Sequence, residues 1–378
     1  MKNRKWKNIC SLAAVLATGV VSADQAAGNR GTPQKSKDMP MNQMDRGHEV
    51  SADQMGAGYN QSAAISLSGE WDWFLQASFI YWHASQENMS LGFTTQTTGG
   101  QEQNPFPGHM VYQDFKYRPG FKVATGFDTK FDDWSFFAEY TWYHHNTHTT
   151  KSEDSGLGID IGNLTPNNND VMSKISSEWE LKVDILDVAV SRPYYQGTRL
   201  TVNPVVGLRA MWIHQEWEQD VTPLNLTAGP SPTTKGDLEL ESKSWGLGPR
   251  FGFYSNWHLG GGFSVIGNAF ASVLYTRYTH LTQTQDQLDA GKTPVRVTNG
   301  THGYLRPQIE TNLGLGWGQY IYGHDYHIGF AATYDFNVFF NENMLRSFAD
   351  GTVASTGSMS TPGNLYLHGL TLTGRFDF

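Results

Sequence analysis

The sequence has only one cysteine, Cys10, and it lies inside the first apolar run of the chain. That run, Ile9 to Val21, follows four basic residues and leads to small residues ending at Ala23, which is the pattern of a secretory signal peptide. We therefore predict that residues 1–23 are a signal peptide for the general secretory pathway. Cys10 precedes the cleavage point, so the exported chain has no cysteine and must be held together by sheet closure or by a large core.

Long hydrophobic runs are also missing. After residue 23 no stretch approaches the ~20 consecutive apolar residues that a membrane-spanning helix requires, which excludes a helical membrane protein. Positive charge is scarce as well: without the four basic residues of the leader, 27 − 4 = 23 basic residues face 36 acidic ones, a net charge of −13. Such a chain is a poor partner for nucleic acid. Residues 24–68 show no apolar periodicity and are predicted to be a disordered periplasmic leader.

What the chain has in abundance is aromatic residues and glycine, with 12 Trp, 17 Tyr, 21 Phe and 40 Gly. From Gly69 onward, about ten segments alternate apolar and polar residues with period two, as strands between two environments do. Between Leu305 and Trp317, for example, leucines, isoleucine and tryptophan alternate with Arg306, Gln308 and Glu310. One face of each strand is therefore expected to contact an apolar environment and the other to contact water. Around Ile185 the apolar phase flips, which suggests a β-bulge.

The connections between these segments alternate strictly between long and short. The long ones lie near residues 85–114, 146–177, 218–243, 280–304 and 341–363, and the short ones near 129–133, 193–197, 256–261 and 318–323. Outer-membrane barrels have long extracellular loops and short periplasmic turns. The pattern therefore predicts an all-β fold, a transmembrane antiparallel up-and-down β-barrel of about 10 strands over residues 69–378. Twelve strands are the alternative, if Met89 to Thr97 and Asp237 to Ser242 extend into hairpins.

A soluble β-sandwich would also alternate apolar and polar residues. Its strands, however, hold about five residues, whereas these segments approach the ~9 to 11 residues needed to cross a membrane at a tilt. Trp and Tyr also gather near the ends of the segments, as at Trp71, Trp82, Trp142, Trp245 and Trp317, where the headgroups of a bilayer would lie. The membrane barrel is therefore the favoured architecture.

The chain ends in an amphipathic segment whose last residues include Phe376 and Phe378. A terminal Phe on such a strand resembles the signal that the barrel assembly machinery of the outer membrane reads. Combined with the leader and the alternating connections, it predicts a location in the bacterial outer membrane.

Several motifs also resemble those of one family. They are Phe79 to Glu87 (FIYWHASQE), Tyr117 to Phe127 (YRPGFKVATGF), Asp187, Pro204 to Ile213 (PVVGLRAMWI) and Gly246 to Gly252 (GLGPRFG). Together they resemble the Legionella-type major outer membrane protein family, which is commonly grouped with the major porins of chlamydia-like bacteria. The resemblance covers roughly residues 70–378 and implies an abundant, surface-exposed, pore-forming protein. Related proteins are often cross-linked by disulfides, which this exported chain cannot form.

Charged side chains on the predicted inward faces are the candidate pore-lining residues, because such charges tune ion selectivity. An alternative interpretation is that they pair across the lumen as structural salt bridges. The predicted set consists of Lys116, Arg118, Lys122, Glu139, Arg199, Arg209, Arg250, Arg306, Glu310, Asp335 and Arg375.

The histidines give a weaker signal. His144, His145 and His148 follow one strand and could in principle bind a metal, but no carboxylate or Cys stands at a fixed spacing. We therefore predict neither a metal site nor a cofactor. His145, His214 and His280 lie near strand ends and have no Ser or acidic partner at a diagnostic spacing, so we expect no enzyme activity.

The function predicted from the sequence is a porin for passive diffusion of ions and small hydrophilic solutes. Ten strands leave only a narrow lumen, although inward glycines such as Gly246, Gly252 and Gly314 would widen it. The alternatives are a non-conducting structural protein or adhesin and, less favoured, a surface hydrolase with a site at the rim. The expected partners are outer-membrane lipid, lipopolysaccharide, the barrel assembly machinery and the solutes, and a homo-trimer is one assembly open to such a barrel.

Overall fold

The structure is a computed structural model. It describes residues 62–67, 72–98, 101–102, 108–129, 133–152, 157–160, 171–223, 236–285, 295–349, 357–360 and 362–378. The predicted signal peptide and most of the predicted leader lie outside these residues, and both remain predictions. The description below concerns the unit from Tyr59 to Phe378.

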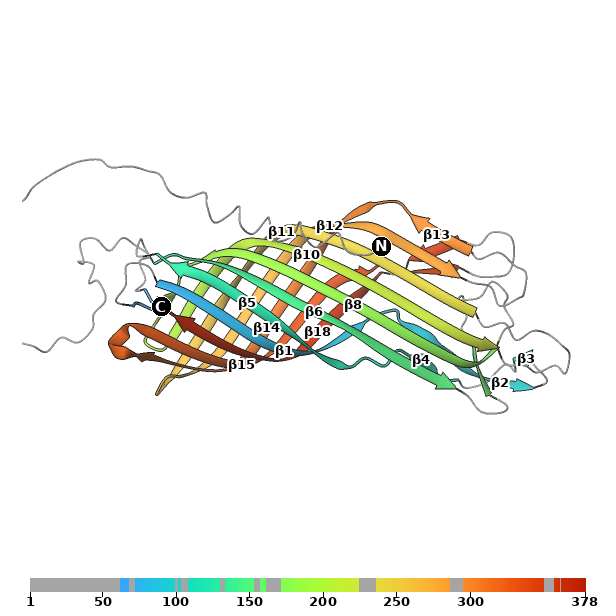
Figure 1. The fold of residues 1–378 in the computed structure, drawn as a ribbon, viewed down its shortest axis with the longest axis horizontal. Helices are drawn as coiled ribbons and strands as arrows, with labels where there is room; N and C mark the ends of the chain where they lie inside the picture. The colour runs from blue at the N-terminus through green and yellow to red at the C-terminus, as the bar shows by residue number, and fades with distance from the viewer. Residues whose placement is uncertain are drawn as a thin grey trace, which may run out of the picture. The chain divides into compact units, whose positions relative to one another are not determined.

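Ten long strands form the wall of a closed barrel (Figure 1). In chain order they are β1 (Asp72–Gln86), β5 (Tyr117–Asp128), β6 (Ser135–Ser152), β8 (Val171–Ser191), β10 (Leu200–Pro223), β11 (Gly236–Gly260), β12 (Phe263–Gln285), β14 (His302–Ile321), β15 (Tyr326–Asn343) and β18 (Gly363–Asp377). Each pairs antiparallel with the next wall strand, and β18 pairs with β1 to close the circle. The predicted ten-stranded up-and-down barrel is confirmed.

The remaining elements lie in the connections. They are β2 (Ser90–Thr98), β3 (Gln101–Glu102), β4 (Met110–Tyr112), β7 (Leu157–Asp160), β9 (Tyr194–Gln196), β13 (Val295–Asn299), the 3-10 helix η3 (Tyr322–His324), β16 (Arg346–Ala349) and β17 (Gly357–Ser360). Among the described residues, no helix is long or apolar enough to cross a membrane.

The long and short connections emerge at opposite ends of the barrel, as the alternation of lengths predicts. We call the end with the short connections, which also holds the C-terminus, the turn end, and the other the loop end (Figure 1). The twelve-strand alternative is wrong. Asp237 to Ser242 belong to β11, and β2 pairs with β4 and β7 inside the connections.

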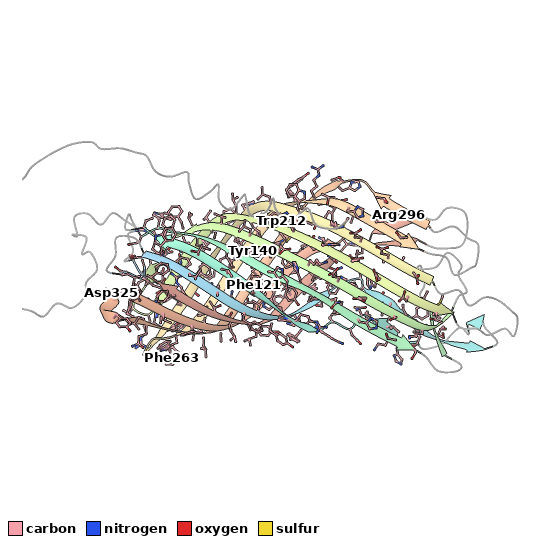
Figure 2. The ribbon with its side chains drawn as sticks, in the orientation of Figure 1. Phe121, Tyr140, Trp212, Phe263, Arg296 and Asp325 are labelled. Atoms are coloured by element: carbon pink, nitrogen blue, oxygen red, sulfur yellow. The ribbon has the colours of Figure 1, made fainter. Side chains whose placement is uncertain are left out.

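The wall strands are longer than the ~9 to 11 residues expected from a membrane crossing. β8 has 21 residues, β10 has 24 and β11 has 25. The apolar outward band occupies only the turn-end part of each strand, for example from Leu247 to Trp257 in β11. In Figure 2, Phe121, Tyr140 and Trp212 lie on the wall within this band. The rest of each long strand continues beyond the band toward the loop end.

The flip near Ile185 is not a β-bulge, because β8 pairs through this region with β6 and β10 without a register shift. Leu186 and Val188 lie on the outside of the barrel, 37% and 50% exposed, whereas Leu181, Val183 and Ile185 are buried inside it. The strand keeps its geometry while the apolar environment changes sides. The flip therefore marks the border of the outward apolar band on its loop-end side.

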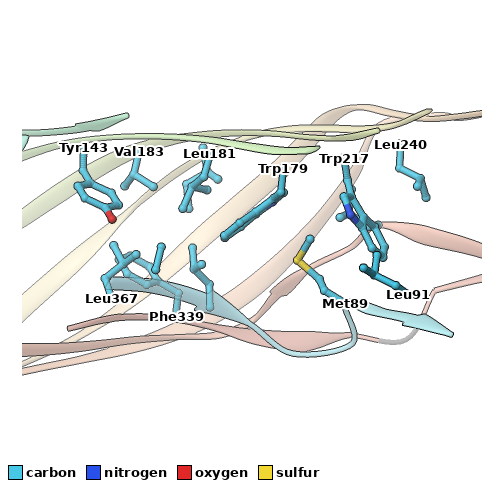
Figure 3. Close-up of a cluster of buried hydrophobic side chains, with 14 of the residues drawn as sticks. Met89, Leu91, Tyr143, Trp179, Leu181, Val183, Trp217, Leu240, Phe339 and Leu367 are labelled. Atoms are coloured by element: carbon cyan, nitrogen blue, oxygen red, sulfur yellow. The ribbon is translucent and has the colours of Figure 1, made fainter. Parts of the chain in front are cut away.

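Inside the loop-end half, the lumen is filled by one cluster of buried apolar side chains (Figure 3). We call it the apolar cluster, and its largest members include Trp82, Tyr143, Trp179, Trp217, Met211 and Phe339. Figure 3 shows Tyr143, Val183, Leu181, Trp179 and Trp217 projecting from the wall along one side, with Phe339 and Leu367 opposite. The loop-end half of the lumen is thus packed like a protein core.

The inward glycines do not widen the lumen as predicted. A Cβ on Gly252 would come within 2.3 Å of Phe270, and one on Gly316 within 2.9 Å of Ile266. The large side chains of neighbouring strands therefore already occupy the space that these glycines leave.

Candidate functional site

The middle of the lumen carries a group of charged side chains that we call the charged layer. It consists of Lys122, Glu139, Asp187, Arg209, Arg250, Glu310 and Asp335. Glu139, Asp187 and Arg209 stand directly opposite one another on β6, β8 and β10. The other members come from β5, β11, β14 and β15, so the layer spans the barrel from wall to wall.

Arg209 is the centre of this layer and is 2% exposed. Its Nε and Nη2 donate to the two carboxylate oxygens of Asp187 at 2.7 and 2.6 Å, and its Nη1 donates to Glu310. Arg250 Nη2 donates to the second oxygen of Glu310 at 2.8 Å, and its guanidinium lies 3.9 Å from the ring centre of Phe270. These charge-assisted and bidentate contacts are the strong kind of hydrogen bond.

Lys122 forms a second branch across the lumen. Its Nζ lies 3.3 Å from Asp335, which also accepts hydrogen bonds from Thr333 and Thr371, each at 2.8 Å. A cavity beside this branch has a volume of about 10 Å³ for the centre of a water molecule, roughly what one buried water needs. Its lining includes Lys122, Glu139, Arg209 and Glu310 of the charged layer together with Trp82, Ile185 and Phe339 of the apolar cluster. The cavity therefore sits where the charged layer meets the apolar cluster.

Three further predicted residues also lie on the inside, but outside this layer. Arg306 is 8% exposed near the loop end, over the rings of Tyr278 and Tyr304. Arg375 lies near the turn end, where it binds Asp377 at 2.6 Å. Arg118 donates to the backbone oxygen of Asn146 on β6.

Two members of the predicted set are not in the lumen. Lys116 and Arg199 are exposed and lie in connections, just before β5 and β10. The alternation of apolar and polar residues continues through both positions in the sequence, although the strands themselves begin only at Tyr117 and Leu200. Phe115, in the connection just before β5, packs against Trp179 of the apolar cluster, with ring centres 5.3 Å apart. Conversely, Asp187 was missing from the predicted set, because the phase flip in β8 concealed its inward direction.

The histidines do not converge on one site. His144 and His148 face outward, where His144 binds Asp184 at 2.9 Å, while His145 faces inward and is buried. His214 and His280 share Glu241 on the outer face, at 3.4 and 3.0 Å. The described residues contain no group of three side chains suited to a metal ion.

The C-terminal phenylalanines lie at the seam of the barrel. Phe378 exchanges two backbone hydrogen bonds with Trp73, at 2.8 and 2.9 Å. Phe376 faces outward and stacks on Tyr326, with ring centres 5.6 Å apart. The last residue thus takes part in the closure of the sheet.

The outer face of the loop-end half is acidic. Glu218 of β10 lies directly between Glu178 of β8 and Glu239 of β11, and Glu216 lies between Glu180 and Glu241. Like charges directly opposite each other destabilise a sheet. Only water can solvate and screen these carboxylates, so this face must be exposed to water and not to lipid.

An apolar outer band around a closed barrel with a charged interior defines an outer-membrane β-barrel protein. The family model described as the Legionella pneumophila major outer membrane protein precursor matches residues 67–378. The chain therefore belongs to this family, and the predicted family resemblance is confirmed. No curated protein matches the sequence.

Solved structures similar to the chain are distant outer-membrane proteins. The outer membrane protease OmpT from Escherichia coli is 10% identical, with 84% of this chain and 99% of that chain covered and a TM-score of 0.38. A Pseudomonas aeruginosa FadL homologue is 8% identical, with 85% and 93% covered and a TM-score of 0.26. Ail, the attachment invasion locus protein of Yersinia pestis, is 6% identical, with 82% and 100% covered and a TM-score of 0.22. Scores this low carry no argument about function.

Proposed function

We propose that the protein is a porin through which ions and small hydrophilic solutes diffuse passively across the bacterial outer membrane. The observation that carries this proposal is the charged layer at the level of the outward apolar band. Ionisable residues at membrane depth are expensive, and by default they mark the path of an ion or a solute. A barrel that served only as an anchor would not need charged residues in its lumen. Apolar side chains could fill this half of the lumen as they fill the loop-end half.

The orientation and surroundings follow from the same proposal. The short connections face the periplasm and the long ones the outside, after export by the general secretory pathway. Outer-membrane lipid and lipopolysaccharide surround the apolar band, and the barrel assembly machinery reads the strand that ends in Phe376 and Phe378. A homo-trimer is the assembly to test first.

Single-channel recording in planar bilayers tests the function. Purified protein is expected to give discrete conductance steps, and Lys122→Gln is expected to shift the reversal potential toward cations, because it removes one positive charge from the layer. Lys243→Gln is the matched control, since Lys243 lies on the outer face. Bilayers that stay silent with both the native chain and variants designed to open the loop end would refute the porin function.

The apolar cluster favours a second candidate, a non-conducting structural protein or adhesin. A lumen packed with Trp179, Trp217 and their neighbours at 0 to 5% exposure blocks water in this arrangement. Silent bilayers combined with binding of intact cells to host cells or peptidoglycan would support this candidate. We propose no catalytic activity: His214, Glu241 and His280 meet on the outer face, with no serine hydroxyl among their hydrogen-bond partners in the described residues.

A further inference from the structure

The connection between β1 and β5 folds into the mouth of the barrel. We call residues 89–95 and 108–115 of this connection the lid segment. Met89, Leu91 and Val111 are 3%, 0% and 8% exposed and belong to the apolar cluster. Figure 3 shows Met89 and Leu91 next to Trp217 of the wall. Part of the core that fills the loop-end half thus comes from a connection and not from the wall.

Side chains of the lid segment also hydrogen-bond to the wall directly. Gln113 Nε2 donates to Thr147 Oγ1 at 3.2 Å, and the backbone N–H of Asp114 donates to Thr149 Oγ1 at 2.9 Å. Both threonines are buried on the inner face of β6. In the described part of the chain, β2 pairs with β3, β4 and β7, none of which is a wall strand. Through β7, which pairs with β8, β2 is nevertheless joined to the barrel sheet. The lid segment can therefore leave the lumen by breaking its ladder to β7, while the hydrogen bonds between wall strands that close the barrel stay intact.

The wall beneath the lid segment is more polar than a permanent core should be. Gln86, Gln215, Gln219 and Gln283 are 0 to 5% exposed, and each has at least one amide atom with no hydrogen-bond partner among the described residues. Both ring nitrogens of His145 are likewise buried without a hydrogen-bond partner among the described residues. Buried polar groups without partners destabilise the arrangement that buries them, and water or a solute would satisfy all of them once the lumen opened.

Three of these polar residues, His145, Gln215 and Gln283, lie in two neighbouring rows of the inner wall. His145, Leu181 and Gln215 stand side by side on β6, β8 and β10, and the next row toward the loop end includes Trp179, Trp217 and Gln283. Amides that both donate and accept, set among flat indole rings, suit an uncharged ligand with hydroxyl or amide groups. The loop-end half of the lumen thus differs from the charged layer in the solute that it favours.

We propose that the lid segment is a gate, and that its departure opens a passage lined by neutral amides for uncharged, hydrogen-bonding solutes such as polyols. The inference rests on the proposed porin function and adds to it both a closed state and a solute class. The closed state is the one described above, held by burial of Met89, Leu91 and Val111. Its cost is the unpaired amides of the wall, so the two arrangements are close enough in free energy to interconvert.

An engineered disulfide tests the gate directly, because the one cysteine of the sequence, Cys10, lies in the predicted signal peptide. Gln113→Cys combined with Thr147→Cys places two thiols where two side chains now touch. Oxidation should lower single-channel conductance at least tenfold, and a reductant should restore it. The two single-cysteine proteins are the controls and should respond to neither treatment. A disulfide that forms fully and leaves the conductance unchanged would overturn the gate and leave the porin function standing.

A second measurement reports on the lid segment without relying on conduction. The native Gln215 side chain is 1% exposed. Gln215→Cys is introduced into two variants of the lid connection, and the rate of its reaction with a membrane-impermeant maleimide is measured in each. Met89→Ser with Leu91→Ser loosens the lid segment, and Met110→Ser with Tyr112→Ser alters exposed side chains of the same connection. Labelling and swelling of liposomes in an uncharged polyol should both rise at least tenfold in the first background only.

The outcomes separate the two proposals. Equal labelling in both backgrounds overturns the gate, whatever the bilayers show. Fast labelling in the loosened variant, with steady conductance in every preparation, also overturns the gate while the porin function stands. If no preparation conducts, the porin function falls, and the gate falls with it.

Discussion

The two halves of this barrel reverse the usual relation between inside and outside. In the turn-end half, the outer face is apolar and the lumen carries the charged layer. In the loop-end half, the outer face carries rows of glutamates and the lumen carries the apolar cluster. β10 passes through both: Leu208 faces outward and Arg209 inward, whereas further on Glu218 faces outward and Trp217 inward.

This difference shows that the environment of a strand decides what each face holds. The turn-end half lies in lipid, where outward side chains must be apolar and every backbone group must be paired within the barrel. The loop-end half stands in water, where the barrel can bury its apolar residues only by turning them inward. One continuous strand thus belongs first to a membrane barrel and then to a soluble one.

The largest expected effect lies in the charged layer. Arg209→Ala leaves Asp187 and Glu310 buried without their main partner, so we expect a loss of about 3 to 5 kcal/mol in the free energy of unfolding. Urea unfolding of the protein in lipid vesicles, followed by tryptophan fluorescence, measures it. Arg296→Ala, at an exposed arginine of the loop end (Figure 2), should change stability by less than about 0.5 kcal/mol. A loss as small as that of the control would show that the layer is hydrated and not buried.

A smaller effect distinguishes the two outer faces. Leu208→Arg places a charge in the apolar band and should cost about 2 to 4 kcal/mol near the middle of the bilayer. Asp220→Arg, on the same face of β10 but opposite Asp237, should cost nothing. The same unfolding measurement compares the two variants. Equal losses would contradict the border that the phase flip of β8 marks between lipid and water.

Much of the fold could be predicted from the sequence, because alternation and the length of connections are local signals. The ten strands, their order and the two ends of the barrel follow from them. The predicted pore-lining set also placed Lys122, Arg209, Arg250 and Glu310 on inward faces, where the structure has them. Whether these residues determine conduction stays a prediction.

The remainder required knowledge of the surroundings of each strand. Leu238 and Leu240 alternate with Glu239 as in any amphipathic strand, and nothing local says that their apolar face looks into a lumen. The same ambiguity made the flip at Ile185 look like a bulge and concealed Asp187. The lid segment was predicted as part of a long loop, because Met89 and Leu91 find their partners only across the barrel.

The smallest expected effect lies in the acidic rows of the loop-end half. Glu218→Lys replaces a repulsive neighbour of Glu178 and Glu239 with an attractive one, so we expect a gain of about 0.2 to 1 kcal/mol in the free energy of unfolding at low salt. Glu218→Gln removes only the repulsion and should gain less. Salt at about 1 M, where the screening length is about 3 Å, should abolish both differences. If Glu218→Lys is no more stable than the native chain at low salt, repulsion between the neighbouring glutamates does not lower the stability of the loop-end half.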